Sequence, residues 1–274
     1  MEETFNITVE MLKIKKACAS GMRDFLREFP HEQYPNGADY QEVLNRCAEH
    51  ERPNYAEWLV RAFGATNTTL SVDKINTDGY VFFAGRIEAR GEIRCKAIRA
   101  GWGIKAGEGI KADCGIEAGE GIKAGCSIKA GWDIKAGCGI EAGWGIKADC
   151  GIKAGCGIKA GWGIDAGCGI EAGCDIEAGC GIKAGGGIKA DCGIKAGCGI
   201  KVGWGIEAGE DIKAGWGIKA GEDIKSGGGI KAGEDFGVYA GLAVRLSYKS
   251  KYAKITAKEK PANIVCGEWV PLDD

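Results

Sequence analysis

Cysteine and histidine are the side chains of this sequence with the widest capacity for nucleophilic, acid–base or metal chemistry. The chain of 274 residues holds 14 cysteines but only two histidines, His31 and His50, both in its first fifth. No serine or cysteine is paired with either histidine in a pattern typical of an activated nucleophile. The sequence therefore predicts no catalytic residue, no bound cofactor and no enzyme.

Ten of the cysteines occupy one variable position of a repeated six-residue unit. Structural metal sites usually take two thiolates from one tight turn, and a separation of six residues works only if the fold brings thiols together. We expect no metal site, and the absence of an apolar signal-peptide core predicts a reducing cytoplasm in which these cysteines are small apolar fillers. Disulfides between stacked thiols are the alternative. The runs are Cys150/Cys156, Cys168/Cys174/Cys180 and Cys192/Cys198.

Six tryptophans share this variable position. Glycines flank them and cannot cover an indole ring, so we expect the indoles to lie on the surface. Exposed aromatic rows are typical of surfaces that bind partners, although indoles stacked for rigidity would show the same pattern. The candidate interaction residues are Trp102, Trp132, Trp144, Trp162, Trp204 and Trp216.

Charged residues define two further candidate surfaces, although a formal net charge of -2 indicates no global preference for anions or cations. Lysine follows the isoleucine of the unit at 16 of 22 positions, which predicts basic stripes that either track phosphates or keep the face solvated. Acidic side chains gather near the end of the repeats, where they could mimic a nucleic-acid backbone. These acidic candidates are Glu210, Asp211, Glu222, Asp223, Glu234 and Asp235.

An internal repeat must position all of these side chains. Isoleucine falls at every sixth position from Ile104 to Ile230, in the unit Ile-[Lys/Glu]-Ala-Gly-x-[Gly/Asp]. A period of six would scatter isoleucine around a helix, whereas in a short strand Ile and Ala point to one side and Lys to the other. The sequence predicts a mainly β chain, a parallel β-solenoid with Ile and Ala inside and glycine-rich corners whose backbone angles only glycine adopts.

The number of residues in one coil decides the cross-section of the solenoid. At the variable position, identical residues recur 12 apart in 11 of 21 pairs and 18 apart in 6 of 20 pairs. Because identical residues often form ladders in solenoids, we favour a flat two-strand coil of 12 residues over a three-strand coil of 18.

Composition divides the chain into three regions, a helical domain at 1–66, the solenoid at 67–245 and a β-rich C-terminal cap or dimerisation segment at 246–274. Apolar spacing predicts three helices, the first running to Phe29 before Pro30, the second capped by Asp39 and the third spanning Pro53 to Gly64.

The C-terminal residues break the six-residue period. Strict apolar alternation predicts one long strand, and two short strands are expected at 262–266 and 269–270. Such a segment covers the open edge of the solenoid or pairs with a second copy, which favours a homodimer. The alternating residues are Phe236, Val238, Ala240, Leu242, Val244, Leu246 and Tyr248.

The six-residue unit resembles the hexapeptide-repeat family of left-handed β-helices, and Gly131-Trp132-Asp133-Ile134 is similar to the bactofilin-type solenoids that polymerise. In hexapeptide acyltransferases the small inward residue precedes the aliphatic one by two places, whereas here Ala follows Ile by two. A closer resemblance, over most of the chain, is to uncharacterised bacterial and prophage proteins that place a short helical segment before Gly-Ile-Lys-Ala-Gly arrays. That resemblance implies no established activity.

The sequence favours a non-catalytic interaction protein, a rigid solenoid that docks on a protein or a protein–nucleic acid complex. The most specific version is a phage-type inhibitor of a host nucleic-acid-processing or defence complex. The acidic candidates would bind that complex by mimicking the phosphates of a nucleic acid. A self-assembling structural protein and a nucleic-acid binder that uses the lysine rows are the alternatives. No run of 18 apolar residues is found, so no membrane partner is expected.

Overall fold

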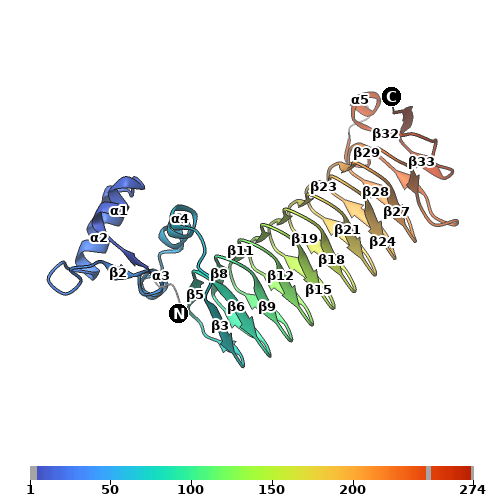
Figure 1. Cartoon of the computed structure of the whole chain (residues 1–274). Coiled ribbons are helices and arrows are strands. Elements are labelled where there is room, and N and C mark those ends of the chain that lie inside the picture. The colour runs from blue at the N-terminus through green and yellow to red at the C-terminus, as the bar shows by residue number, and fades with distance from the viewer. Residues whose placement is uncertain (1–4, 245–247, 273–274) are drawn as a thin grey trace.

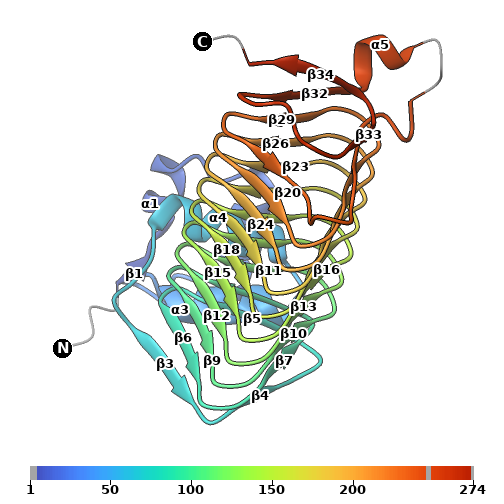
Figure 2. The ribbon, with the colours of Figure 1, turned by 90° about the vertical axis from the view of Figure 1, so that its right-hand side faces the viewer.

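The computed structural model describes residues 5–244 and 248–272, and it shows the predicted parallel β-solenoid (Figure 1). Helices lie at its N-terminal end, and the last strands of the chain lie at its C-terminal end, as Figure 2 also shows. The helices and the last strands are therefore separated by the length of the repeat array. In the described part of the chain, no helix is long and apolar enough to cross a membrane.

The N-terminal segment holds four helices where the sequence predicts three. The run that ends at Phe29 is broken, because Lys16 has a left-handed backbone with φ 59° and Cys18 then caps the next helix by accepting the Gly21 amide at 3.4 Å. The predicted cap at Asp39 is confirmed, since its carboxylate accepts the Glu42 amide at 3.1 Å. The helices are α1 (Val9–Ile14), α2 (Ala19–Glu28), α3 (Tyr40–Glu49) and α4 (Pro53–Phe63), and strands β1 (Asn6–Ile7) and β2 (Ala38–Asp39) pair antiparallel.

The core of these helices includes residues from the first turn of the solenoid. Tyr40 and Leu44 are fully buried in one cluster with Phe82 and Ala84. The side chain of Gln41 donates to the Phe82 carbonyl at 2.8 Å and accepts the Ala84 amide at 2.9 Å. This side-chain amide therefore makes the backbone hydrogen bonds that a neighbouring strand would make at the edge of the solenoid. Helix α3 thus covers the free edge of the strand at Tyr80–Phe83.

The solenoid has three sides, and the prediction of a 12-residue coil is wrong. Ile110 pairs with Ile128 and Ile116 with Ile134, so each coil takes 18 residues and contains three strands. About eleven such coils stack. The chain passes in turn through three parallel sheets, named here sheets I, II and III, and turns at corners named I/II, II/III and III/I.

The strands of each sheet are three residues long over most of the array. Sheet I contains β3 (Thr69–Val72), β6 (Arg86–Ala89), β9 (Ile104–Ala106), β12 (Ile122–Ala124), β15 (Ile140–Ala142), β18 (Ile158–Ala160), β21 (Ile176–Ala178), β24 (Ile194–Ala196), β27 (Ile212–Ala214) and β30 (Ile230–Lys231). Sheet II contains β4 (Ile75–Asn76), β7 (Ile93–Cys95), β10 (Ile110–Ala112), β13 (Ile128–Ala130), β16 (Ile146–Ala148), β19 (Ile164–Ala166), β22 (Ile182–Ala184), β25 (Ile200–Val202), β28 (Ile218–Ala220), β31 (Val238–Tyr239) and β33 (Ile264–Cys266). Sheet III contains β5 (Tyr80–Phe83), β8 (Ala97–Ala100), β11 (Ile116–Ala118), β14 (Ile134–Ala136), β17 (Ile152–Ala154), β20 (Ile170–Ala172), β23 (Ile188–Ala190), β26 (Ile206–Ala208), β29 (Ile224–Ser226), β32 (Lys254–Ala257) and β34 (Glu268–Pro271).

Backbone conformation explains why the coil is three-sided. A two-strand coil must reverse direction at each corner, and tight reversals need residues with positive φ. Between residues 65 and 240, all of which the structure describes, no residue has positive φ. The corners therefore bend the chain only part of the way, and three of them close one coil.

The corner glycines are required by close approach between coils, not by the unusual backbone angles that the sequence predicts. A Cβ atom on Gly155 would lie 2.0 Å from the carbonyl oxygen of Gly137 in the preceding coil, and most glycines that follow the inward alanine are in the same situation. The isoleucines and alanines are buried and the residue between them points outward, as predicted.

The C-terminal segment continues the coils but not as the predicted long strand. Only β31 is extended, residues 242–244 turn, and Leu246 lies outside the described residues. Helix α5 (Lys249–Tyr252) follows, and then β32, β33 and β34 add parallel strands to sheets II and III. The two short strands expected near 264 and 270 are confirmed, and they form the last layer of the array.

Candidate functional site

Each face of the solenoid carries one row of outward side chains, supplied by the residue between the inward isoleucine and alanine. The 18-residue coil sorts the six acidic members of these rows unevenly among the faces. Two of them, Glu141 and Glu177, lie on sheet I, and Asp165 is alone on sheet II. The other three lie on sheet III, and they are Glu117, Glu171 and Glu207.

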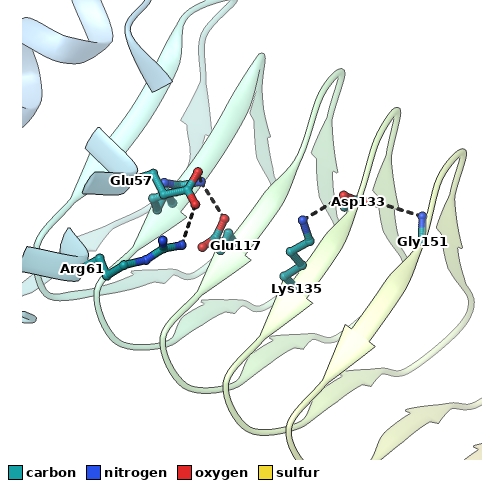
Figure 3. Close-up of polar contacts among 7 residues, drawn as sticks. Glu57, Arg61, Glu117, Asp133, Lys135 and Gly151 are labelled. Carbon is teal, nitrogen blue, oxygen red and sulfur yellow. Dashed lines mark hydrogen bonds and ion pairs between the residues drawn. The ribbon is translucent and has the colours of Figure 1, made fainter. Parts of the chain in front are cut away.

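On sheets I and III, acids are stacked next to basic residues of neighbouring coils and form ion pairs with them. On sheet I, Lys123 Nζ is 2.9 Å from Glu141 Oε2. On sheet III, Arg99 contacts Glu117 at 2.6 Å and also reaches Glu57 of α4 at 3.3 Å, which connects the helices to this face. Figure 3 shows the carboxylates of Glu57 and Glu117. Five of the ten row lysines on these two faces thus have an acidic partner within 4.0 Å, and they are Lys123, Lys135, Lys153, Lys159 and Lys213.

Sheet II carries a row of lysines with one acidic interruption. Among the described residues, no member of this row has an ion pair within 4.0 Å in the repeats. Neighbouring strands of a sheet are about 4.8 Å apart, so the ammonium groups repel one another and an external anion would relieve that repulsion. The row consists of Lys111, Lys129, Lys147, Asp165, Lys183, Lys201 and Lys219.

A groove runs along each face beside its row, and the three grooves differ in charge. The groove on sheet II has a volume of about 690 Å³ and is lined by five lysines and two aspartates. The groove on sheet I, of about 670 Å³, is lined by four basic and five acidic side chains, and that on sheet III, of about 600 Å³, by four of each. Only the sheet II groove is clearly positive.

Aromatic side chains line the same groove at its C-terminal end. The rings of Trp216 and Phe236 stack with centroids 5.9 Å apart and an interplanar angle of 19°. Lys219 Nζ lies 5.2 Å from the centre of the Tyr239 ring, a cation–π distance. The groove thus combines an apolar flat wall with a line of cations, and we name it the sheet II groove, defined by Lys183, Lys201, Lys219, Trp216 and Phe236 together with Tyr239.

The structure separates the predicted tryptophans into groups. Corner I/II holds the stacked pair Trp144 and Trp162 as well as Trp216, and Trp132 and Trp204 lie singly at corner II/III. These five indoles are 54 to 65% exposed, as expected from the sequence. Trp102 differs: it is half-buried at corner III/I, next to the segment after α4, and its indole Nε1 is buried without a hydrogen-bond partner.

The predicted acidic candidates do not form one cluster. They are distributed over all three corners of the last coils, with Glu210 at III/I, Glu222 at II/III and Glu234 at I/II. Asp211 accepts the Gly229 amide at 2.7 Å and Asp223 accepts the Lys254 amide at 2.7 Å, so these two bond successive coils together. Asp235 lines the sheet II groove.

Asp133 shows the same bond at an earlier coil. Its carboxylate accepts the Gly151 amide at 2.8 Å and pairs with Lys135 at 2.9 Å (Figure 3). Burial acts to raise the pKa of this carboxyl, but the Lys135 ammonium and the amide outweigh it and the pKa is lowered. Aspartate in place of the second corner glycine is therefore a structural residue that links coils.

The cysteine runs of the sequence are not brought together. Cys150 and Cys156 lie at different corners, whereas cysteines 18 residues apart stack, as in Cys150/Cys168 and Cys180/Cys198. The expectation that the corner cysteines are small apolar fillers does not fit the exposed ones, which are Cys138, Cys156, Cys168 and Cys180.

Sequence reasoning predicted basic stripes but missed that the row of sheet II holds a single acid, and it missed the aromatic contribution of Phe236 and Tyr239. The signal was present, since sorting the outward residues by position within an 18-residue coil places five of the six acids on the other two faces. It could be read only with the right coil length.

Residues 1–67 match the family model described as the YdhT N-terminal domain. The match covers the helical segment that the sequence predicts in front of the repeats, and it does not extend into them. No curated protein and no solved structure matches the chain.

Proposed function

We propose that this protein is a non-catalytic binding protein whose sheet II groove holds an extended anionic polymer with flat rings, single-stranded nucleic acid. The observation that carries the proposal is the unequal charge of three otherwise equivalent grooves. The same repeat builds all three faces, yet in the described repeats row lysines have acidic partners within 4.0 Å only on sheets I and III. A lysine row left uncompensated by its own fold is suited to phosphate contacts.

The aromatic wall supports nucleic acid over other polyanions. Proteins that bind single strands combine a positive groove with aromatic rings on which bases stack, and the ring faces of Trp216 and Phe236 lie beside the lysine row. Lysine without arginine favours contacts to phosphate as a point charge, with little readout of base sequence. We therefore expect binding with weak sequence preference.

Inhibition of a host nucleic-acid enzyme by mimicry receives less support from the geometry. A mimic of a phosphate backbone needs its carboxylates along one track, and the acidic candidates occupy three corners. Self-assembly remains the second candidate, because β33 and β34 end the array as edge strands in the described part of the chain. The homodimer expected through this C-terminal segment stays a prediction.

Fluorescence anisotropy with labelled oligothymidylate tests the proposal, using the full chain. The test variant replaces Lys147, Lys183 and Lys219 of sheet II by Gln, and the matched control replaces Lys153, Lys189 and Lys225, which occupy the equivalent places on sheet III. We expect the test variant alone to lose on the order of tenfold in affinity and about 2 in the slope of log affinity against log salt.

Equal losses in the two triple variants would contradict the assignment to sheet II, since the charge removed is the same. Heparin, a polyanion without stacking rings, is the second probe. Tight heparin binding with no oligothymidylate binding would reject nucleic acid as the ligand. Light scattering on the same samples decides the self-assembly candidate, which requires particles that grow with protein concentration.

A further inference from the structure

Four cysteines stack in four consecutive coils at corner III/I. Each is bonded to the next through the backbone, with the Cys156 amide 3.1 Å from the Cys138 carbonyl oxygen, the Cys174 amide 3.2 Å from Cys156 and the Cys192 amide 3.4 Å from Cys174. All four side chains are exposed or half-exposed. We name Cys138, Cys156, Cys174 and Cys192 the cysteine ladder.

Acidic residues surround the cysteine ladder. Glu120 and Glu210 occupy the same corner position in the coils that precede and follow it, and Asp175 and Asp191 are chain neighbours of its upper members. Partial desolvation, Asp175 and Glu210 raise the pKa of the Cys192 thiol, and desolvation and Cys156 raise that of Cys138. These negative surroundings disfavour the approach of anionic reagents and the formation of thiolates that have no cation beside them. They favour the binding of a cation in place of the thiol protons.

The spacing of the ladder determines which cation fits. In the described part of the chain, no group of three or more Cys, His, Asp or Glu side chains is placed to hold a metal ion, so a closed tetrahedral zinc site is not formed. Stacked strands lie about 4.8 Å apart, which is too far for the Cβ atoms of an unstrained disulfide. Two metal–sulfur bonds of about 2.3 Å placed end to end span about 4.6 Å, close to that spacing.

We propose that the cysteine ladder binds two soft, two-coordinate cations, Cu(I) being the physiological example, one between Cys138 and Cys156 and one between Cys174 and Cys192. Each ion forms two sulfur–metal bonds, two thiol protons pass to water and no electron is transferred. Thiolate ligands select Cu(I) over harder cations. The pairs Cys150/Cys168 and Cys180/Cys198 offer the same arrangement at the other corners.

Anaerobic titration with Cu(I), against a chromogenic Cu(I) chelator and with glutathione present, tests this proposal. The ladder variant is Cys156→Ser with Cys174→Ser, which leaves no two adjacent thiols at this corner. The matched control is Cys114→Ser with Cys126→Ser, because these corner cysteines stack under Trp132 and Trp144 and have no thiol at the same corner position of the neighbouring coils. Both variants lose two exposed or half-exposed thiols.

We expect the ladder variant to lose the ions of its corner and the control to bind as many as the parent chain. Cu(I) should also raise the thermal unfolding temperature of the parent and the control more than that of the ladder variant, because each ion links two coils. Equal loss of copper from both variants would show binding by thiol number alone and overturn the proposal. So would a parent chain that releases all its copper to glutathione.

Discussion

Trp144 and Trp162 stack on each other across two consecutive coils. The Trp162 amide donates to the Trp144 carbonyl at 3.0 Å, and the indole rings are 6.0 Å apart with an interplanar angle of 15°. The contact exists because the residues are 18 positions apart, which is one full coil. Both indoles remain more than half exposed, so the pair presents a flat apolar surface at corner I/II.

Removing this pair should spare the fold. We expect Trp144→Ala with Trp162→Ala to lower the free energy of unfolding by roughly 0.5–1.5 kcal/mol, the value of an exposed aromatic contact. Loss of the tryptophan exciton couplet in the far-ultraviolet circular dichroism spectrum would report the stack itself. Trp132→Ala with Trp204→Ala is the control, because those indoles are unstacked, and an equal spectral change there would argue against the stack.

Inward and outward positions of one coil should respond very differently to substitution. Ile164 is 1% exposed, so Ile164→Asp buries an unpaired carboxylate and should cost at least about 3 kcal/mol or prevent folding. Lys159 points to solvent with a long 3.7 Å ion pair to Glu177, so Lys159→Ser should change stability by less than about 0.5 kcal/mol. Thermal melts followed by circular dichroism compare the two, and similar melting temperatures would reject the assignment of faces.

Two glycines of one repeat should differ in their tolerance of a methyl group. A Cβ on Gly155 would meet the Gly137 carbonyl oxygen at 2.0 Å, whereas the nearest atoms to a Cβ on Gly151 are 3.4 Å away. We expect Gly155→Ala to destabilise by about 1–3 kcal/mol through backbone displacement and Gly151→Ala to be close to neutral. Chemical denaturation measures both. Asp149 occupies the same corner position in another repeat, so the backbone of a coil can move to fit a Cβ there at some cost in stability. An unchanged denaturation midpoint for Gly155→Ala would show that this displacement costs no stability and would contradict the prediction.

The bonds between coils should weaken in acid. The Lys213 ammonium and the Gly229 amide lower the pKa of Asp211, so its contribution to stability is complete above the ordinary aspartate pKa of about 3.9 and is lost as the pH falls through the lower folded value. Asp211→Asn keeps an oxygen that can accept the amide but does not titrate. We expect its melting temperature to fall less steeply below pH 4 than that of the parent, and parallel curves would contradict this role.

The sequence by itself determined the local structure of this protein. A period of six with isoleucine and alanine two apart can be satisfied only by short strands with those residues inside, and the burial of Ile164 and the exposure of Lys159 follow from that alternation. The first residues of α3 and α4 were equally readable, because the Asp39 cap and Pro53 at the first helical position act within a few residues of their own position. Local geometry decides such features, so local sequence predicts them.

Only the tertiary structure decided how many strands form one coil, and with it every contact between coils. Recurrence of identical residues favoured 12, because the chain repeats Trp and Cys at that interval even though Trp132 and Trp144 lie at different corners. The bend at each corner depends on backbone angles that Gly-x-Gly leaves open, and stacking against the next coil fixes them. That choice of 18 leaves one acid in the lysine row of sheet II and aligns Cys138 with Cys156, so both proposed sites exist only in the folded chain.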